Sequence, residues 1–320
     1  MKIELLAPAG SSECAKVAVD SGADAIYMGG AKYGAREFAK STIEDNLLDT
    51  IRYVKNRGVK FYLTVNTLFK QKELKEIFLF LDPFVDAGVD AFIVQDLGVA
   101  MMLKERYKNV ELHASTQMNI TSSKGIKLVE GLGFKQVVLA RELSLKEIKN
   151  IRKEVGDNIR LEAFVHGSMC YAYSGTCLMS SFIGKESGNR GRCKGPCRLP
   201  YDRANDKKLS LKEPYILSMK DMCALDFLYD LIHVGVDSFK IEGRMRQETY
   251  VSGVTKIYRK YIDFIMENIN LQKSEFEEMF KKNLDIEKDK NVLIDLYNKG
   301  GFTNYYNKHN GCDMIQRFER

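Results

Sequence analysis

Short apolar segments alternate with amphipathic segments along most of the chain, and this alternation constrains the fold more than any other feature of the sequence. A small motif recurs at three points: Gly22-Ala-Asp24, Gly88-Val-Asp90 and Gly235-Val-Asp237 each precede an apolar run. A glycine in the left-handed conformation commonly ends a helix, and a short continuous apolar run is typical of a buried strand. The motif therefore predicts repeated helix–strand junctions.

Eight segments have the pattern of buried strands: Ile3–Leu6, Ala25–Met28, Lys60–Val65, Ala91–Val94, Glu111–Ser115, Gln136–Ala140, Arg160–Val165 and Ser238–Ile241. Helical periodicity fits between most of them, as at Ser12–Ser21, Lys72–Leu81 and Ser144–Val155. We expect Pro83 to stop the second helix, and Ser144 and Glu147 to cap the third. Eight strand–helix units predict a closed (β/α)8 TIM-like barrel, with a doubly wound sheet as the alternative.

The predicted barrel is interrupted once. Residues 167–236 separate the seventh and eighth predicted strands and hold most of the cysteines. After the eighth strand, a helix is predicted at Tyr250–Asn268, and Lys- and Glu-rich helical sequence continues to about Asp289. We therefore expect a barrel domain over residues 1–250, including the insertion, and a helical C-terminal extension over 251–320.

Polar residues follow several predicted strands, at Asn66, Gln117, His166, Glu242 and Arg244. In (β/α)8 barrels the active site lies at the C-terminal ends of the strands. We therefore expect Asn66, Gln117, His166 and Glu242 to be catalytic residues in one pocket, with Arg244 binding substrate. Polar loops alone explain any single one of these residues equally well, and His166 could instead be a hydrogen-bonded orienting group.

Five of the seven cysteines lie within 54 residues: Cys170, Cys177, Cys193, Cys197 and Cys223. In a reducing compartment such a group indicates metal binding or catalysis, not a disulfide framework. The close cysteine pairs of zinc sites are absent, and glycines separate the cysteines. The spacing therefore favours an iron–sulfur cluster over zinc, with unligated buried thiols as a further alternative.

The insertion is also basic. Residues 185–212 contain nine Lys and Arg against three acidic residues, which gives +6 and equals the net charge of the whole chain. Arg190, Arg192, Lys194 and Arg198 could contact RNA phosphates, and Tyr171 and Tyr173 could stack on a displaced base. The alternative is that the cations solubilise a long insertion and the two tyrosines belong to the core.

Neither a membrane span nor a signal peptide is visible. No apolar run approaches the ~20 residues that a membrane-spanning helix needs. The apolar stretch near the start is too short for a signal peptide and soon meets Pro8. We therefore expect a cytoplasmic protein without membrane contact, and nothing in the sequence indicates its oligomeric state.

One segment carries a specific resemblance. Residues 162–170, Glu-Ala-Phe-Val-His-Gly-Ser-Met-Cys, followed by Gly175, Cys177 and Ser180, resemble the signature of peptidase family U32, the collagenase-like proteases. Further similar stretches, which bring the resemblance to most of residues 1–260, are 4–10, 22–27, 189–201 and 240–244. Residues 189–201 look most like the subgroup that contains the ribosomal-RNA cytidine hydroxylase. The C-terminal part is shorter than in many members, so we expect a minimal or a truncated member.

The resemblance implies an iron–sulfur enzyme. Some members add oxygen at position 5 of an RNA pyrimidine, with prephenate as a required metabolite, and others hydroxylate ubiquinone with a four-cysteine [4Fe–4S] cluster. By motif, the ligands here would be Cys170, Cys177, Cys193 and Cys223, with Cys197 competing for one position. We expect hydroxylation of tRNA or rRNA, with prephenate as a possible co-substrate.

Three alternatives remain at this stage: a collagenase-like peptidase, a hydroxylase of quinones or other small molecules, and a cluster-binding partner protein without its own reaction. A peptidase needs an activated nucleophile or a metal-bound water. The sequence contains neither His-Glu-x-x-His nor Gly-x-Ser-x-Gly. A partner protein would not need a strand-end pocket filled with polar side chains.

Overall fold

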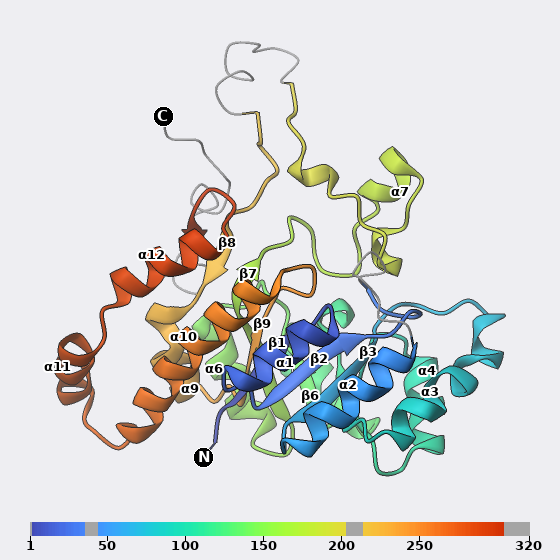
Figure 1. Ribbon diagram of the computed structural model, residues 1–320, viewed down its shortest axis with the longest axis horizontal. Helices are drawn as coiled ribbons and strands as arrows, with labels where there is room; N and C mark the ends of the chain where they lie inside the picture. The colour runs from blue at the N-terminus through green and yellow to red at the C-terminus, as the bar shows by residue number, and fades with distance from the viewer. Residues whose placement is uncertain (1, 36–43, 203–213, 304–320) are drawn as a thin grey trace.

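Eight parallel strands form a closed barrel in the computed structural model, which describes residues 2–35, 44–202 and 214–303 (Figure 1). The barrel strands are β1 (Glu4–Pro8), β2 (Ala25–Gly29), β3 (Lys60–Val65), β4 (Ala91–Val94), β5 (Glu111–Ala114), β6 (Gln136–Val138), β7 (Arg160–Ser168) and β9 (Ser238–Ile241). Strand β9 pairs in parallel with β1 on one side and with β7 on the other, which closes the sheet. The predicted (β/α)8 barrel is confirmed.

The recurring Gly-x-Asp motif joins helices to strands as predicted, and its aspartate has an additional role. Each glycine has a positive φ: +90° at Gly22, +105° at Gly88 and +90° at Gly235. Each aspartate accepts a hydrogen bond from a backbone amide of a neighbouring strand, from Leu5 to Asp24 (2.9 Å), Phe61 to Asp90 (2.8 Å) and Leu161 to Asp237 (2.7 Å). The motif therefore also fixes adjacent strands to one another.

Helices surround the strands: α1 (Ser12–Asp20), α2 (Glu44–Asn56), α3 (Ile77–Asp86), α4 (Leu97–Arg106), α5 (Ser123–Gly131), α6 (Leu145–Val155), α9 (Leu228–His233) and α10 (Glu248–Glu267). The capping box of Ser144 and Glu147 is present at the start of α6. The expectation that Pro83 stops a helix is wrong, because Pro83 lies inside α3. Proline removes one hydrogen bond, but burial of Ile77, Leu81 and Phe84 on both sides of it holds the helix together.

The insertion between β7 and β9 extends past the barrel and contains a small strand that the sequence did not reveal. Strand β8 (Asp221–Cys223) pairs antiparallel with the end of β7, and β10 (Phe302–Thr303) pairs in parallel with β8. The insertion also contains helix α7 (Met179–Gly184) and two 3-10 turns, η3 (Gly188–Arg190) and η4 (Pro196–Arg198). Figure 1 shows α7 and the neighbouring loops projecting from one side of the barrel.

Helix α10 completes the barrel. It follows the last barrel strand and packs against α1 and β1, burying Tyr250, Val254 and Tyr258. The expected boundary between residues 250 and 251 falls inside this helix, and α11 (Lys273–Asn283) and α12 (Ile286–Leu296) follow it. Three further 3-10 turns are η1 (Glu73–Lys75), η2 (Thr116–Met118) and η5 (Leu225–Phe227). Within the described ranges, no helix is long and apolar enough to cross a membrane.

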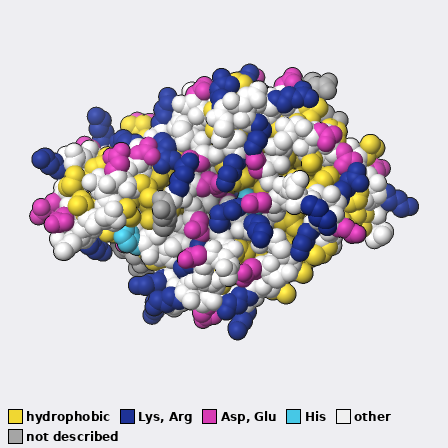
Figure 2. Space-filling model, turned by 90° about the horizontal axis from the view of Figure 1, so that it is seen from below, with side chains coloured by type: hydrophobic (Ala, Val, Ile, Leu, Met, Phe, Trp, Pro, Cys, Tyr) yellow, Lys and Arg dark blue, Asp and Glu magenta, His cyan; other side chains and the backbone are white. Residues whose placement is uncertain are grey.

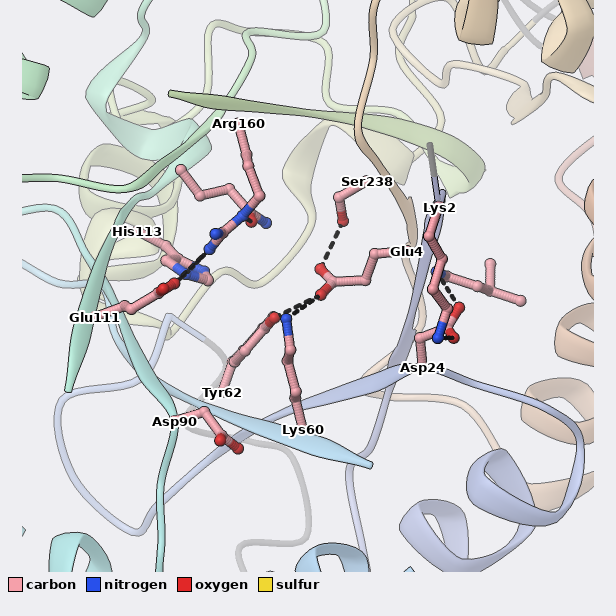
Figure 3. Close-up of polar contacts among 12 residues, drawn as sticks. Lys2, Glu4, Asp24, Lys60, Tyr62, Asp90, Glu111, His113, Arg160 and Ser238 are labelled. Atoms are coloured by element: carbon pink, nitrogen blue, oxygen red, sulfur yellow. Dashed lines mark hydrogen bonds and ion pairs between the residues drawn. The ribbon is translucent and has the colours of Figure 1, made fainter. Parts of the chain in front are cut away.

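A polar network closes the N-terminal end of the barrel (Figure 3). Glu4 accepts hydrogen bonds from the Tyr62 hydroxyl (2.6 Å) and the Ser238 hydroxyl (3.0 Å). Glu111 contacts the buried His113 ring (3.0 Å) and forms an ion pair with Arg160. In this fold the N-terminal end of the strands usually contributes stability, and the functional site lies at the C-terminal end.

Candidate functional site

A cavity of about 350 Å³ opens at the C-terminal ends of the barrel strands, where the insertion covers them. Its walls combine residues after several strands, such as Asn66 after β3, Arg141 after β6 and Glu242 after β9, with residues of the insertion. Among the described residues, its charged lining comprises one carboxylate, Glu242, and six cations: Arg141, Arg198, Lys240, Arg244, Arg246 and Lys299. The cavity is therefore strongly cationic.

The molecular face turned away from the insertion differs from this cavity. Figure 2 views the molecule from below Figure 1, and basic and acidic side chains are interspersed across that face. Since interspersed charges largely cancel, a polyanion would find no continuous basic surface there. The concentration of positive charge at the cavity is thus not repeated on this face.

A buried ion pair forms the floor of the cavity. The Lys240 ammonium lies 2.7 Å from Glu162, whose side chain is fully buried, and 4.4 Å from the centre of the Tyr27 ring. Burial lowers the pKa of Lys240, and the Glu162 charge opposes this shift. Beside it, the buried Arg244 guanidinium donates to the Thr64 hydroxyl at 2.7 Å. Because Glu162 balances the charge of Lys240, the net positive charge at the bottom of the cavity comes from Arg244.

Asn66, Gln117 and Glu242 all line this cavity, as expected. Asn66 is held in place because its carbonyl accepts from the Ala35 amide (3.0 Å) and its amide donates to Ser115 (3.4 Å). The side-chain oxygen of Gln117 is buried and has no hydrogen-bond partner within the described ranges. A buried acceptor without a partner is costly, which suits a group that receives a hydrogen bond from a ligand.

His166 is in the core and does not line the cavity. Its Nδ1 lies 3.3 Å from the Tyr258 hydroxyl, and Tyr250, Tyr258 and Phe302 surround its ring. Burial lowers its pKa to about 3, although the Glu242 charge raises it slightly. The expected direct role of His166 is therefore not supported by its placement, which corresponds to the alternative of an orienting group.

Four thiols line the cavity: Cys170, Cys177, Cys193 and Cys197. All four are free, and Cys193 accepts hydrogen bonds from Ser180 (3.7 Å) and from the Gly195 amide (3.3 Å). Burial raises the pKa of Cys197; nearby Arg198 lowers it, and the other three thiols raise it further. Within the described ranges, no three His, Cys, Asp or Glu side chains converge closely enough to hold a single metal ion.

Cys223 lies elsewhere. It belongs to β8, where it pairs with His166 of β7, and its buried sulfur accepts from the Tyr258 hydroxyl at 3.8 Å. Burial raises its pKa to about 11. The structure thus groups Cys197 with Cys170, Cys177 and Cys193, whereas the ligand set expected from the motif contained Cys223, with Cys197 as the competitor.

One wall of the cavity carries a cluster of cations around Ser168. The Ser168 hydroxyl oxygen accepts from Lys299 (2.5 Å) and from Arg246 (3.3 Å). Arg141 donates to the backbone carbonyl of Ser168 at 2.9 Å, and Lys299 also lies 3.6 Å from Asp221. Burial lowers the pKa of Lys299; Asp221 opposes this shift, and the charges of Arg198 and Arg246 reinforce it.

The basic residues expected to bind substrate fall into two groups. Arg198 lines the cavity and donates to Ser218 (3.0 Å) and to backbone carbonyls, including that of Met219 (2.6 Å).

Arg190 forms an ion pair with Glu73 (2.6 Å), while Arg192 pairs more loosely with Glu186 (3.6 Å). These two and the exposed Lys194 lie outside the cavity lining. Arg190 therefore fastens the insertion to the barrel, whereas Arg192 and Lys194 extend into solvent.

Tyr171 and Tyr173, which the sequence suggested for stacking on a base, are surface residues and not core residues. Tyr171 lines the cavity with 48% of its surface exposed, and Tyr173 is 56% exposed outside the lining. Helix α7 adds Phe182, at 81% exposure, to the same insertion. Exposed aromatic rings beside a cationic cavity are suited to stacking on a base.

Sequence reasoning did not assign four residues of the site to substrate binding: Ser168, Lys240, Arg246 and Lys299. Lys240 and Ser168 lie inside stretches that carried the family resemblance, so a signal was available for them. Arg246 follows such a stretch by two residues. Lys299 has no local signal, because only the pairing of β10 with β8 brings its segment to the cavity.

A closed (β/α)8 barrel whose C-terminal mouth is covered by a cysteine-rich, cationic insertion defines the class of this protein. The sequence profile of peptidase family U32 matches residues 10–314. The solved structure of the U32 peptidase Mk0906 shares the fold, with a TM-score of 0.52 and 15% identity over 76% of this chain and 93% of that chain. The chain belongs to peptidase family U32.

Two curated relatives are similar over most of this chain. The 23S rRNA 5-hydroxycytidine C2501 synthase of Escherichia coli is 40% identical over 267 residues, which are 83% of this chain and 40% of that protein. The tRNA hydroxylation protein P1 of Bacillus subtilis is 37% identical over 290 residues, which are 88% of this chain and 68% of that protein. The chain thus spans less than half the length of the first relative and about two thirds of the second.

Proposed function

We propose that this chain hydroxylates a pyrimidine base of rRNA or tRNA at position 5. The observation that carries the proposal is the cavity at the C-terminal mouth of the barrel, where four thiols and six cations of the described chain line one space. Relatives named for rRNA and tRNA hydroxylation are similar over more than four fifths of this chain, which supports the same substrate class.

We further propose that Cys170, Cys177, Cys193 and Cys197 hold a [4Fe–4S] cluster. Four soft thiol donors that line one cavity are the donor set such a cluster requires. Because each thiolate of a cubane binds a different iron, the four sulfurs need not converge on one point, as they would around zinc. When bound, the cluster would supply electron-transfer chemistry next to the substrate.

The residues of the barrel mouth have separate tasks in this proposal. The unpaired oxygen of Gln117 accepts from a donor on the base edge, and Asn66, fixed by Ala35 and Ser115, limits the orientations of the base. Glu242 is the one carboxylate among the described residues of the lining and is the candidate for moving a proton at the base. His166 positions β7 against Tyr258 and does not contact substrate.

Hydroxylation replaces a C–H bond by C–OH and oxidises the base by two electrons, so a co-reactant must supply the oxygen atom and accept those two electrons. The family resemblance implies prephenate, which carries two carboxylates. Arg244 and Lys240, the latter paired with Glu162, place N–H donors at the floor of the cavity, and Tyr27 and Phe164 provide apolar surface beside them. We propose that this floor holds the carboxylates of the co-substrate, because charge-assisted hydrogen bonds to carboxylate are among the strongest available.

A peptidase reaction is less well supported by the cavity. A serine nucleophile needs a neighbouring base that removes its proton. The Ser168 hydroxyl oxygen instead accepts hydrogen bonds from two cationic groups, Lys299 and Arg246. With Lys299 charged, this arrangement is suited to binding an anion; Lys299 could accept the Ser168 proton only in its neutral form.

The proposal is tested in a strain that lacks the gene for this chain. Total RNA from that strain, and from the strain complemented with the wild type, is digested to nucleosides and examined by mass spectrometry. We expect a 5-hydroxylated pyrimidine that disappears on deletion and returns with the wild type but not with Glu242→Gln. Identical nucleosides in all strains, together with gelatin cleavage that Ser168→Ala abolishes, would establish the peptidase instead.

A further inference from the structure

We infer that Ser168, Arg246 and Lys299 form a phosphate-binding site inside the cavity, which holds a phosphodiester of the substrate strand. The inference rests on the proposed function, since it names the group by which RNA is held. It concerns residues that belong to the cavity wall and not to the basic segment at 185–212. The three residues lie far apart in the sequence, and each is delivered to the wall by a different element.

The hydrogen-bond pattern identifies the wall as a group of donors. The Ser168 hydroxyl oxygen accepts from the Lys299 ammonium (2.5 Å) and from the Arg246 guanidinium (3.3 Å). With its oxygen occupied by two donors, the hydroxyl proton of Ser168 is directed to another acceptor. Lysine and arginine have no acceptor atoms. The three side chains therefore present N–H and O–H groups to the same space, which is the arrangement that binds an oxyanion.

The wall also carries more positive than negative charge. Arg246 and Lys299 are joined by Arg141, which donates to the Ser168 carbonyl, and by Arg198 further along the cavity lining. The acidic groups near this wall are Asp221, 3.6 Å from Lys299, and Glu242 in the lining. Like charges at close range in a partly buried site repel one another, and an anion bound between them removes that repulsion.

The scaffold holds two of the cations in fixed positions. The Arg246 guanidinium stacks on the Tyr297 ring at 3.3 Å from its centre. Lys299 lies on the turn between α12 and β10, which Gly300 and Gly301 form with φ of +71° and +92°. Strand β10 then pairs with β8, so that Phe302 lies opposite Asp221, and β8 pairs with the end of β7 at Ser168. A preorganised site loses less entropy when it binds its ligand.

A phosphodiester fits this wall better than the carboxylate of a small co-substrate does. Lys240 and Arg244 already provide a cationic floor, so the cations around Ser168 form a second group on the wall. An RNA strand offers a phosphate beside each base, and holding one at the wall would place that base inside the cavity. Arginine and lysine together are a common pair of phosphate ligands.

The experiment measures the dissociation constant of a single-stranded oligoribonucleotide for the anaerobically purified protein at several salt concentrations. Lys299→Ala and Arg246→Ala should each raise Kd about tenfold at low salt. Each should also reduce the slope of log Kd against log salt by about 0.7, the value for one lost phosphate contact on a single strand. Lys299→Arg should keep most of the affinity.

Lys290→Ala is the matched control. The Lys290 side chain is 20% exposed, as is that of Lys299, and it also pairs with an aspartate, Asp226, but it lies outside the cavity lining. We expect its Kd and salt slope to equal those of the wild type. Thermal unfolding of all variants separates a binding defect from loss of the fold. Wild-type affinity and salt slope in folded Lys299→Ala and Arg246→Ala would overturn the inference.

A second readout distinguishes this site from the co-substrate site and from the proposed function. In a hydroxylation assay, Lys299→Ala should raise KM for RNA and leave KM for prephenate unchanged; the opposite pattern would assign the wall to the small carboxylate and overturn the inference. If the wild type binds RNA with a Lys299-dependent salt slope but hydroxylates nothing, the proposed function fails and the phosphate site stands. A set of oligonucleotides, each with one uncharged methylphosphonate linkage at a different position, extends this test. Lys299→Ala should leave the affinity unchanged only for the oligonucleotide whose modified linkage occupies the site.

Discussion

The cysteines illustrate what can be read from single residues. Spacing and glycine content predicted a thiol site in the insertion, and Cys170, Cys177 and Cys193 do line one cavity. The fourth position could not be chosen from spacing, because it depends on the short strand β8, which turns Cys223 towards Tyr258 and away from the cavity. A three-residue strand has too little sequence to show a periodic pattern.

We predict that Cys197→Ser lowers the iron content of the protein and that Cys223→Ser does not. Protein purified without oxygen should contain about four iron atoms and an equivalent amount of acid-labile sulfide per chain. Because the structure groups Cys197 with the other three thiols, its loss removes one ligand, whereas Cys223 contacts the core. Iron and sulfide assays on both variants decide the matter. Retention of iron by Cys197→Ser and its loss in Cys223→Ser would make Cys223 the fourth ligand.

We predict that the ionised Glu111 carboxylate stabilises the N-terminal end of the barrel and that acid removes this stabilisation. The hydrogen bond from His113, with further help from Arg160, lowers the pKa of Glu111 to about 2 (Figure 3). An unfolded glutamate has a pKa of about 4.3. The stabilisation is therefore complete above about pH 4.3 and is lost as the pH falls towards 2, where the folded protein also takes up the proton.

Urea unfolding at pH 5 and pH 3 tests this contribution. The free energy of unfolding of the wild type should fall more between these pH values than that of Glu111→Gln, which has no carboxylate to protonate. Glu105→Gln, which changes an exposed glutamate of α4, serves as the control and should follow the wild type. Parallel losses in the wild type and Glu111→Gln would show that the network does not stabilise the charged form.

At the scale of elements, the insertion is held against the barrel by close backbone contact. Gly175 has φ of +79°, and a Cβ atom there would lie 2.7 Å from the Gln117 carbonyl oxygen and 3.0 Å from the Gln95 amide nitrogen. Only glycine allows this approach of the loop to the ends of β4 and β5 without displacement. The two cysteines nearest to Gly175 in the sequence, Cys170 and Cys177, depend on this contact for their positions.

We predict that Gly175→Ala disturbs the site and spares the barrel. The added methyl group forces the loop away from Gln117, so iron content and RNA hydroxylation should fall severalfold, while the far-ultraviolet circular dichroism stays that of the wild type. Gly131→Ala is the control, because a Cβ at that helical position meets nothing within 4 Å. Wild-type iron content in Gly175→Ala would mean that the loop has room to adjust.

The elements of the barrel were largely predictable, and the reason lies in the chain itself. Each barrel strand is a continuous buried run, and the Gly-x-Asp motif marks three junctions with a turn residue and a backbone hydrogen-bond acceptor. The helix through Pro83 was mispredicted because tertiary burial of its neighbours outweighed one missing hydrogen bond. The extension was harder to place, since the position of Lys299 depends on pairing between β8 and β10, which are distant in sequence.

At the scale of the whole molecule, the two ends of the barrel have different roles. The N-terminal end is closed by paired charges around Glu4 and Glu111, whereas the C-terminal end holds a cavity whose described lining has six cations, one carboxylate and four thiols. The position of Asn66, Gln117, Glu242 and Arg244 after predicted strands correctly placed them in the cavity. They did not predict the placement of His166, because β7 continues past the barrel and its side chain there turns into the core.

A reaction with purified components measures whether this cavity oxidises an RNA pyrimidine, as we propose. Protein purified without oxygen is incubated with prephenate and RNA from a strain that lacks the gene, and the digested RNA is examined by mass spectrometry. We expect a 5-hydroxylated pyrimidine whose formation requires both the protein and prephenate, and which is absent with Cys197→Ser. An iron-loaded wild-type protein that leaves the RNA unchanged under these conditions would contradict the proposal.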